Sequence, residues 1–205
     1  MNGAVRLAAR YPRVWHVMEA EGAGPWVQDM GLLPAAALCD LAGVAPDGSN
    51  RDDFQHINLG AGRTAVLRLQ QMADRRLRPT LAGSFRDRPE LWRQHIDSHV
   101  FFWATEERRD KFIAATERDR ARRPRELSVW PPVIFEIKTA ALLDRCGEFA
   151  YFATFNTGST VLGGARARRD ENTLRSVADY RSGPIAELAI RGRVDLAGIV
   201  VLDPV

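Results

Sequence analysis

The chain has 205 residues, of which 45% are hydrophobic and 27% charged, an ordinary globular composition that can bury a core within one domain. The formal net charge is only +3, and lysine supplies just Lys111 and Lys138 among 29 basic residues, so arginine carries nearly all positive charge. No apolar run approaches the roughly 20 residues of a membrane-spanning helix, so we expect no membrane partner.

The first half of the chain is predicted to mix strands with short helices. In chain order we expect a strand at 13–18, helices at 19–30 and 34–42, a loop at 45–53, a strand at 64–69, and helices at 70–78 and 89–97. Pro34 favours the second helix, because proline suits a first helical turn. The segment 45–97 as a whole is expected to be a helical insertion in a single domain spanning 1–205.

The middle of the chain holds the clearest strand of the first half, at 99–104. Thr105 then opens a helix, since its hydroxyl can cap the first turn and acidic residues follow it there. Phe112 and Ile113 are expected to form the buried side of this helix. The charge run 117–126 is expected to be a solvated helix end or loop.

The back half is predicted to be rich in strands. We expect a strand at 133–137, a helix at 139–145, a strand at 149–155, a Gly/Ser/Thr loop at 156–164, a charged segment at 166–172, and two strands in the tail. Strands mixed with short helices, followed mostly by strands, favour the α+β class.

Glu187 interrupts the first of two apolar runs in the tail. Burying a charge without a partner is costly, so an acidic residue in a predicted strand has two interpretations. It lies on an exposed edge, paired with Arg191 or Arg193, or it is kept for chemistry.

The two cysteines, Cys39 and Cys146, are too widely separated to form a metal pattern or a disulfide framework. We therefore expect reduced, partly buried thiols and no metal. The first ten residues lack the pattern of a signal peptide, and a cytoplasmic location is expected.

Three segments along the chain carry a family resemblance. The first is Val14-Trp-His-Val17 with Gly31-Leu-Leu33, the second is Val100-Phe-Phe-Trp103 with Thr105-Glu-Glu-Arg-Arg109, and the third is Ala186-Glu-Leu-Ala-Ile-Arg-Gly-Arg-Val194 with Ile199-Val-Val201. Together they resemble the ADP-ribosyltransferase fold, especially DarT-like toxins that modify DNA bases. The resemblance implies a split mixed or antiparallel sheet with short flanking helices, and NAD as substrate.

A second resemblance is to an uncharacterised bacterial family with three short segments. Here they are Gly31-Leu-Leu33 with Ala37-Leu-Cys-Asp-Leu41, Val100 to Arg108, and Asn156 to Thr160.

The first resemblance also implies roles for individual residues. Glu187 becomes the catalytic carboxylate that stabilises an oxocarbenium-like state, as in glycoside hydrolysis. His16 hydrogen-bonds a ribose hydroxyl, with a core histidine as the alternative. Trp103 or Phe102 stacks on nicotinamide, and strand alternation allows only one of the two to face the site.

Two further sets of residues are candidates for binding phosphate. Arg108 or Arg109 can grip the pyrophosphate with a guanidinium fork, although such a run is often solvated. Asn156, Thr157 and Ser159 can form a phosphate-binding or acceptor loop, or only a turn.

The leading functional prediction is NAD-dependent ADP-ribosyl transfer, with nucleic acid as the expected acceptor and a toxin or defence role. The arginine excess gives mild support to phosphate-bearing partners, although an arginine-rich genome with solvated faces is the preferred explanation. Two alternatives remain open: an RNA 2′-phosphotransferase-like enzyme, and a non-catalytic binding protein of the same fold. The absence of GxGxxG and Walker sequences argues against Rossmann and P-loop proteins.

Overall fold

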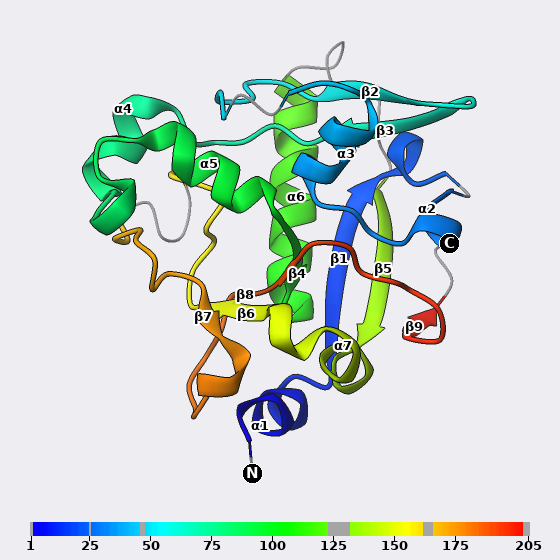
Figure 1. Ribbon diagram of the computed structural model, residues 1–205, viewed down its shortest axis with the longest axis vertical. Coiled ribbons are helices and arrows are strands. Elements are labelled where there is room, and N and C mark those ends of the chain that lie inside the picture. Colours follow the sequence, from blue (N-terminus) through cyan, green and yellow to red (C-terminus); the bar gives the residue numbers. More distant parts are fainter. Residues whose placement is uncertain (1, 25, 46–47, 123–131, 162–165, 203–205) are drawn as a thin grey trace.

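The computed structural model describes residues 2–24, 26–45, 48–122, 132–161 and 166–202, and its fold is α+β (Figure 1). A seven-stranded sheet has the strand order β7-β6-β8-β4-β1-β5-β9, and every strand pair in it is antiparallel. A separate hairpin joins β2 and β3. The described helices are all too short or too polar to span a bilayer.

The bounds of the described elements are as follows. The strands are β1 (Arg13–Glu19), β2 (Gln55–Gly60), β3 (Arg63–Leu67), β4 (His99–Trp103), β5 (Pro132–Lys138), β6 (Ala150–Ala153), β7 (Arg175–Ser176), β8 (Glu187–Arg191) and β9 (Val200–Leu202). The α-helices are α1 (Gly3–Arg10), α2 (Trp26–Met30), α3 (Ala35–Leu41), α4 (Asp74–Leu77), α5 (Pro89–Asp97), α6 (Glu106–Arg122) and α7 (Thr139–Cys146).

The two faces of the main sheet have different coverings. The core face carries Val14, Phe102 and Leu188, which pack with residues of α1, α2, α3 and α7 in the largest hydrophobic cluster. The opposite face carries Glu187 and is called the Glu187 face below. Helix α6 contacts β1 and β4, and α5 of the 45–97 segment contacts β4.

Backbone pairing is sparse where the two halves of the main sheet meet. Pairing between β1 and β4 is confined to Trp15 opposite Trp103, whereas β1 pairs with β5 along its whole length. The strands β7, β6, β8 and β4 therefore form one half of the sheet, and β1, β5 and β9 form the other.

The segment 45–97, expected to be helical, contains the β2–β3 hairpin as well as α4 and α5. Its ends are tied together by Arg51, whose guanidinium donates to both carboxylate oxygens of Asp97 at 2.6 and 2.7 Å. Gln70 adds a third bond to Asp97 at 2.7 Å. A second hydrophobic cluster around Trp92 and Leu77 fills its interior.

Several predicted elements need correction. The helix expected at 19–30 is reduced to a 3-10 turn over 20–22 and α2, because β1 continues to Glu19. Glu19 lies opposite Pro132 of β5 and forms an ion pair with Arg68. The helix at 70–78 shrinks to α4 and a short 3-10 turn over 78–80. Helix α1, capped by Asn2, was not predicted.

Other predictions are confirmed. The strand at 99–104 is β4, both tail strands are present as β8 and β9, and the Thr105 hydroxyl accepts a bond from the Arg108 N–H at 3.3 Å. Cys39 and Cys146 are both buried. The predicted charge run extends past Arg122, and the predicted Gly/Ser/Thr loop past Val161, into segments outside the described residues.

Candidate functional site

Glu187 lies in the interior of the sheet, at the start of β8 between β6 and β4. Only 4% of this residue is exposed, so the edge-strand interpretation is wrong. The backbone N–H and the hydroxyl of Thr157 both donate to Oε2 of Glu187, at 3.0 and 2.9 Å. Oε1 accepts no hydrogen bond from any other residue that the structure describes.

The ionisation of Glu187 is unusual for a carboxylic acid. Burial raises its pKa to about 7, against the two Thr157 bonds and the positive charges of Arg108 and Arg169, which all lower it. Desolvation has the largest effect because a carboxylate this deeply buried has lost nearly all contact with water. A carboxyl with this pKa can accept or release a proton near neutral pH.

A row of side chains crosses the sheet on the Glu187 face. In antiparallel strands, directly opposed residues project to the same face. Glu187 is opposite Trp103, Trp103 is opposite Trp15, and Trp15 is opposite Glu136. Trp103 therefore shares a face with Glu187, and Phe102 points into the core.

Helix α6 packs over this aromatic row. Phe112 of α6 lies against Trp103 with ring centroids 4.9 Å apart, and the Arg109 guanidinium lies 5.3 Å from the Trp15 ring. Trp103 remains half-buried. The helix that follows β4 thus brings two predicted site residues, Arg108 and Arg109, to the same face as Glu187.

His16 is not part of this site. Its ring lies on the core face, 5.6 Å from the ring of Phe102. Its Nδ1 lies 2.8 Å from the Phe101 carbonyl oxygen, so Nδ1 carries the hydrogen and donates. Burial lowers the pKa of His16, which keeps the ring neutral. The histidine bridges β1 and β4 where backbone pairing is sparse, and Glu187 projects to the other face.

The remaining predicted residues differ in whether they interact with Glu187. Arg108 is half-buried and its charge acts on Glu187, whereas Arg109 stacks on Trp15 and pairs with Asp110 at 2.8 Å. Asn156 is half-buried beside Thr157, and Thr157 makes the contact with Glu187.

Arg169 is a site residue that the sequence did not reveal. It is fully buried, and it acts electrostatically on Glu187. It stands in a charged segment beside Arg168, which is exposed and pairs with Asp170. Nothing in the local sequence distinguishes the buried arginine from its solvated neighbour.

The loop that carries Thr157 is anchored to the 45–97 segment. Thr160 donates its N–H and its hydroxyl to the Gln71 carbonyl, at 2.9 and 2.7 Å. The Ser159 hydroxyl contacts the Gln71 side chain at 3.3 Å. The loop therefore has a fixed position between Glu187 and this segment.

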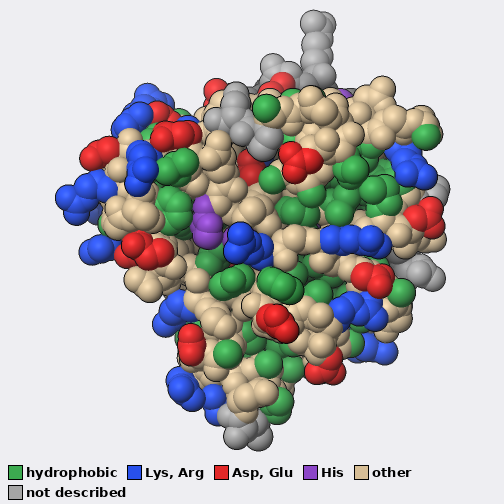
Figure 2. Space-filling view, viewed as in Figure 1, with side chains coloured by type: hydrophobic (Ala, Val, Ile, Leu, Met, Phe, Trp, Pro, Cys, Tyr) green, Lys and Arg blue, Asp and Glu red, His purple; other side chains and the backbone are tan. Residues whose placement is uncertain are grey.

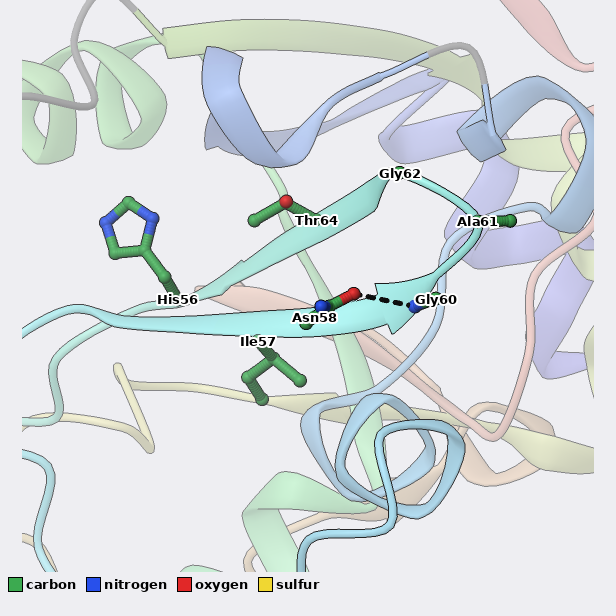
Figure 3. Close-up of a pocket in the computed structure, with 7 residues that line it drawn as sticks. All are labelled: His56, Ile57, Asn58, Gly60, Ala61, Gly62 and Thr64. Carbon is green, nitrogen blue, oxygen red and sulfur yellow. Dashed lines mark hydrogen bonds between the residues drawn. The ribbon is translucent and has the colours of Figure 1, made fainter.

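A pocket of about 350 Å³ lies elsewhere, on the β2–β3 hairpin (Figure 3). It is lined by His56, Ile57, Asn58, Gly60, Ala61, Gly62 and Thr64. Asn58 accepts a bond from the Gly60 N–H at 2.8 Å, which shapes the turn. None of the predicted site residues lines this pocket.

Within the described residues, no group of three or more His, Cys, Asp or Glu side chains could hold a metal ion. A family model described as a family of unknown function, DUF7002, matches residues 12–197. No curated protein and no solved structure matches the chain.

Proposed function

The chain belongs to DUF7002, a family of unknown function, and we propose that it transfers ADP-ribose from NAD with Glu187 as the essential carboxylate. One observation carries the proposal: Glu187 is a buried carboxyl with one oxygen fixed by Thr157 and the other without a described hydrogen-bond partner. Such an arrangement orients Oε1 for a ligand and is unusual for a purely structural residue.

The proposed chemistry uses this carboxyl in two ways. As the bond between nicotinamide and C1 of the ribose breaks, its electron pair leaves with nicotinamide and positive charge develops on the sugar. The ionised carboxylate stabilises that charge. A nucleophilic atom of the acceptor then bonds to C1 and gives its proton to the carboxylate. A pKa of about 7 suits a group that must serve in both states.

The surroundings of Glu187 support the same proposal. Trp103 is its direct neighbour across the β4–β8 pair and can stack on nicotinamide, and Arg108 supplies a cation for the pyrophosphate. The sheet is antiparallel, in line with the kind of sheet that the resemblance to ADP-ribosyltransferases implies, and β1 and β4 are joined at a single residue pair. His16 supports no part of the proposal.

Nucleic acid is the acceptor that we propose. Residues 73–88 contain five arginines and two aspartates, and Figure 2 shows basic side chains, interspersed with acidic ones, over the corner where α4 lies. Arg75, Arg76 and Arg86 are exposed and form no ion pair with another described residue. Free guanidinium groups on a fixed segment favour phosphate contacts.

An RNA 2′-phosphotransferase-like activity is the second candidate. The two arginines whose charges act on Glu187 favour it, because phosphoryl chemistry depends on cations. In this case Glu187 would only hold the loop through Thr157, as it also would in a non-catalytic binding protein.

Incubation with labelled NAD and separate pools of DNA, RNA and protein tests the proposal. We expect the wild-type protein to label one pool, Glu187→Gln to lose at least about a hundredfold, and Glu148→Gln, an exposed control, to keep full activity. Equal labelling by wild type and folded Glu187→Gln would contradict the proposal. Release of a 2′-phosphate from RNA by both would establish the second candidate.

A further inference from the structure

Arg169 is the most completely buried charged residue near the proposed site, with no exposed surface. Its guanidinium donates to the Ser159 carbonyl at 2.7 Å, to the Ala167 carbonyl at 2.9 Å and to the Thr80 hydroxyl at 3.2 Å. A buried cation must be compensated by such bonds, because desolvation without partners costs several kcal/mol.

The backbone around Arg169 is fixed as firmly as the side chain. The Arg169 N–H donates to the Thr80 carbonyl at 2.8 Å, and the Arg169 carbonyl accepts from the Ala82 N–H at 2.9 Å. Leu81 and Arg169 form a parallel bridge. The residue is thus a connection between the back half of the chain and the 45–97 segment.

The bond from Arg169 to Thr80 has a defined direction. The Thr80 hydroxyl donates its hydrogen to the Leu77 carbonyl at 2.7 Å, so its oxygen is left to accept from Arg169. An apolar side chain of equal size at this position would remove the acceptor, whereas serine would keep it.

A short path leads from Arg169 to Glu187. Arg169 holds the Ser159 carbonyl, and two residues earlier Thr157 holds Oε2 of Glu187. The charges also act on each other directly: Arg169 lowers the pKa of Glu187, and Glu187 raises that of Arg169, against burial, which brings the guanidinium pKa down to about 10.

We infer that Arg169 is a positioning residue for Glu187. Through the bond from Arg169 to Thr80, the 45–97 segment also helps to position this carboxyl. The inference concerns the placement and ionisation of Glu187. Only its kinetic readout rests on the proposed transferase activity.

A carboxyl titration by NMR tests the inference without any substrate. Full-length protein labelled at glutamate side chains gives a signal for Glu187 that is identified by its loss in Glu187→Gln. We expect its midpoint to rise by about 1 or more in Arg169→Met and by less in Thr80→Val. Thr80→Ser and Arg168→Lys, the matched controls, should leave it unchanged.

The outcomes separate this inference from the proposed function. A midpoint unchanged in both folded Arg169→Met and Thr80→Val would overturn the inference; if Arg169→Met does not fold, Thr80→Val alone decides. A shifted midpoint in a protein without NAD turnover supports the inference and removes the transferase proposal. With turnover, the ionisation limb of the kcat/KM profile should move with the NMR midpoint, whereas a merely structural role would lower activity at every pH.

Discussion

Thr157 donates two hydrogen bonds to a single oxygen of Glu187, one from its backbone N–H at 3.0 Å and one from its hydroxyl at 2.9 Å. Both bonds favour the ionised carboxylate, yet burial still holds the pKa at about 7. A loop residue therefore fixes the orientation of the carboxyl, while the sheet around it sets the proton affinity.

The first prediction concerns stability and pH. Because the pKa of Glu187 is raised from 4.5 to about 7, the folded protein holds a proton that the unfolded chain has lost in this window. This contribution to stability is complete below pH 4.5 and is lost as the pH rises to 7, at about 3 kcal/mol in all. In urea unfolding, the free energy of unfolding of Glu187→Gln relative to that of wild type should rise by this amount between pH 4.5 and 7. A pH-independent difference would contradict the prediction.

The second prediction concerns His16, which bridges β1 and β4 on the core face. His16→Leu leaves the Phe101 carbonyl without its donor and should lower the free energy of unfolding by about 1–3 kcal/mol. His16→Asn, which can place an N–H near the same point, should lose less. NAD turnover per folded molecule should be unchanged in both, because the ring points away from Glu187. Loss of turnover in a folded, stable His16→Asn protein would return His16 to the site.

The positions of His16 and Glu187 on opposite faces show what the sequence alone could not predict. Both residues stand in strands that were correctly predicted, and both strands belong to one sheet. The face of each side chain depends on register, and Trp15 opposite Trp103 places His16 on the core face. A change of register by one residue would have reversed this result, and no local pattern around His16 specifies that register.

Arg169 illustrates a second limit of sequence reasoning. Amphipathic helices and apolar strands are visible as periodic patterns, so α5, β4 and β8 could be predicted. A buried arginine in a charged loop has no such pattern, because its side chain is held by Thr80, 89 residues away, and by the Ser159 carbonyl of the preceding loop. Glu187 could be found only because an acidic residue within an apolar run is exceptional.

The third prediction concerns His99, which is buried on β4 opposite Arg191. Burial lowers its pKa from 6.5 to about 4, against the hydrogen bond to the His95 carbonyl, which raises it; the charges of His95 and Arg191 lower it slightly further. Between these pH values His99 is protonated in the unfolded chain but neutral in the folded protein. The free energy of unfolding therefore decreases by about 3 kcal/mol as the pH falls from 6.5 to 4. His99→Phe keeps an aromatic ring but cannot bind a proton, so it should abolish this acid-dependent loss of stability in chemical unfolding. An unchanged dependence of stability on pH below 6.5 would contradict the prediction.

The effects of His99 and Glu187 oppose each other between pH 4.5 and 6.5. The contributions of these two groups should nearly cancel across this range, since one group gains what the other loses. Glu187→Gln should then show a steeper acid loss than wild type, and His99→Phe a steeper loss toward neutral pH. Parallel curves for all three proteins would show that neither pKa is perturbed as described.

The last prediction concerns the exposed arginines of α4. If Arg75 and Arg76 contact phosphates, Arg75→Glu with Arg76→Glu should weaken binding of labelled single-stranded DNA or RNA at least about tenfold at physiological salt. The slope of log affinity against log salt should fall by about 1 to 2, since each lost phosphate contact contributes roughly 0.7 for a single strand.

Lys138→Glu with Arg181→Glu makes the same change in net charge at exposed positions outside the 45–97 segment, and it should have a much smaller effect. Equal weakening by both pairs would mean that only the overall charge matters. Equally tight binding of a polyglutamate peptide would show that the surface does not select phosphate. All of these measurements can be made on Glu187→Gln protein, so they are independent of whether the chain transfers ADP-ribose.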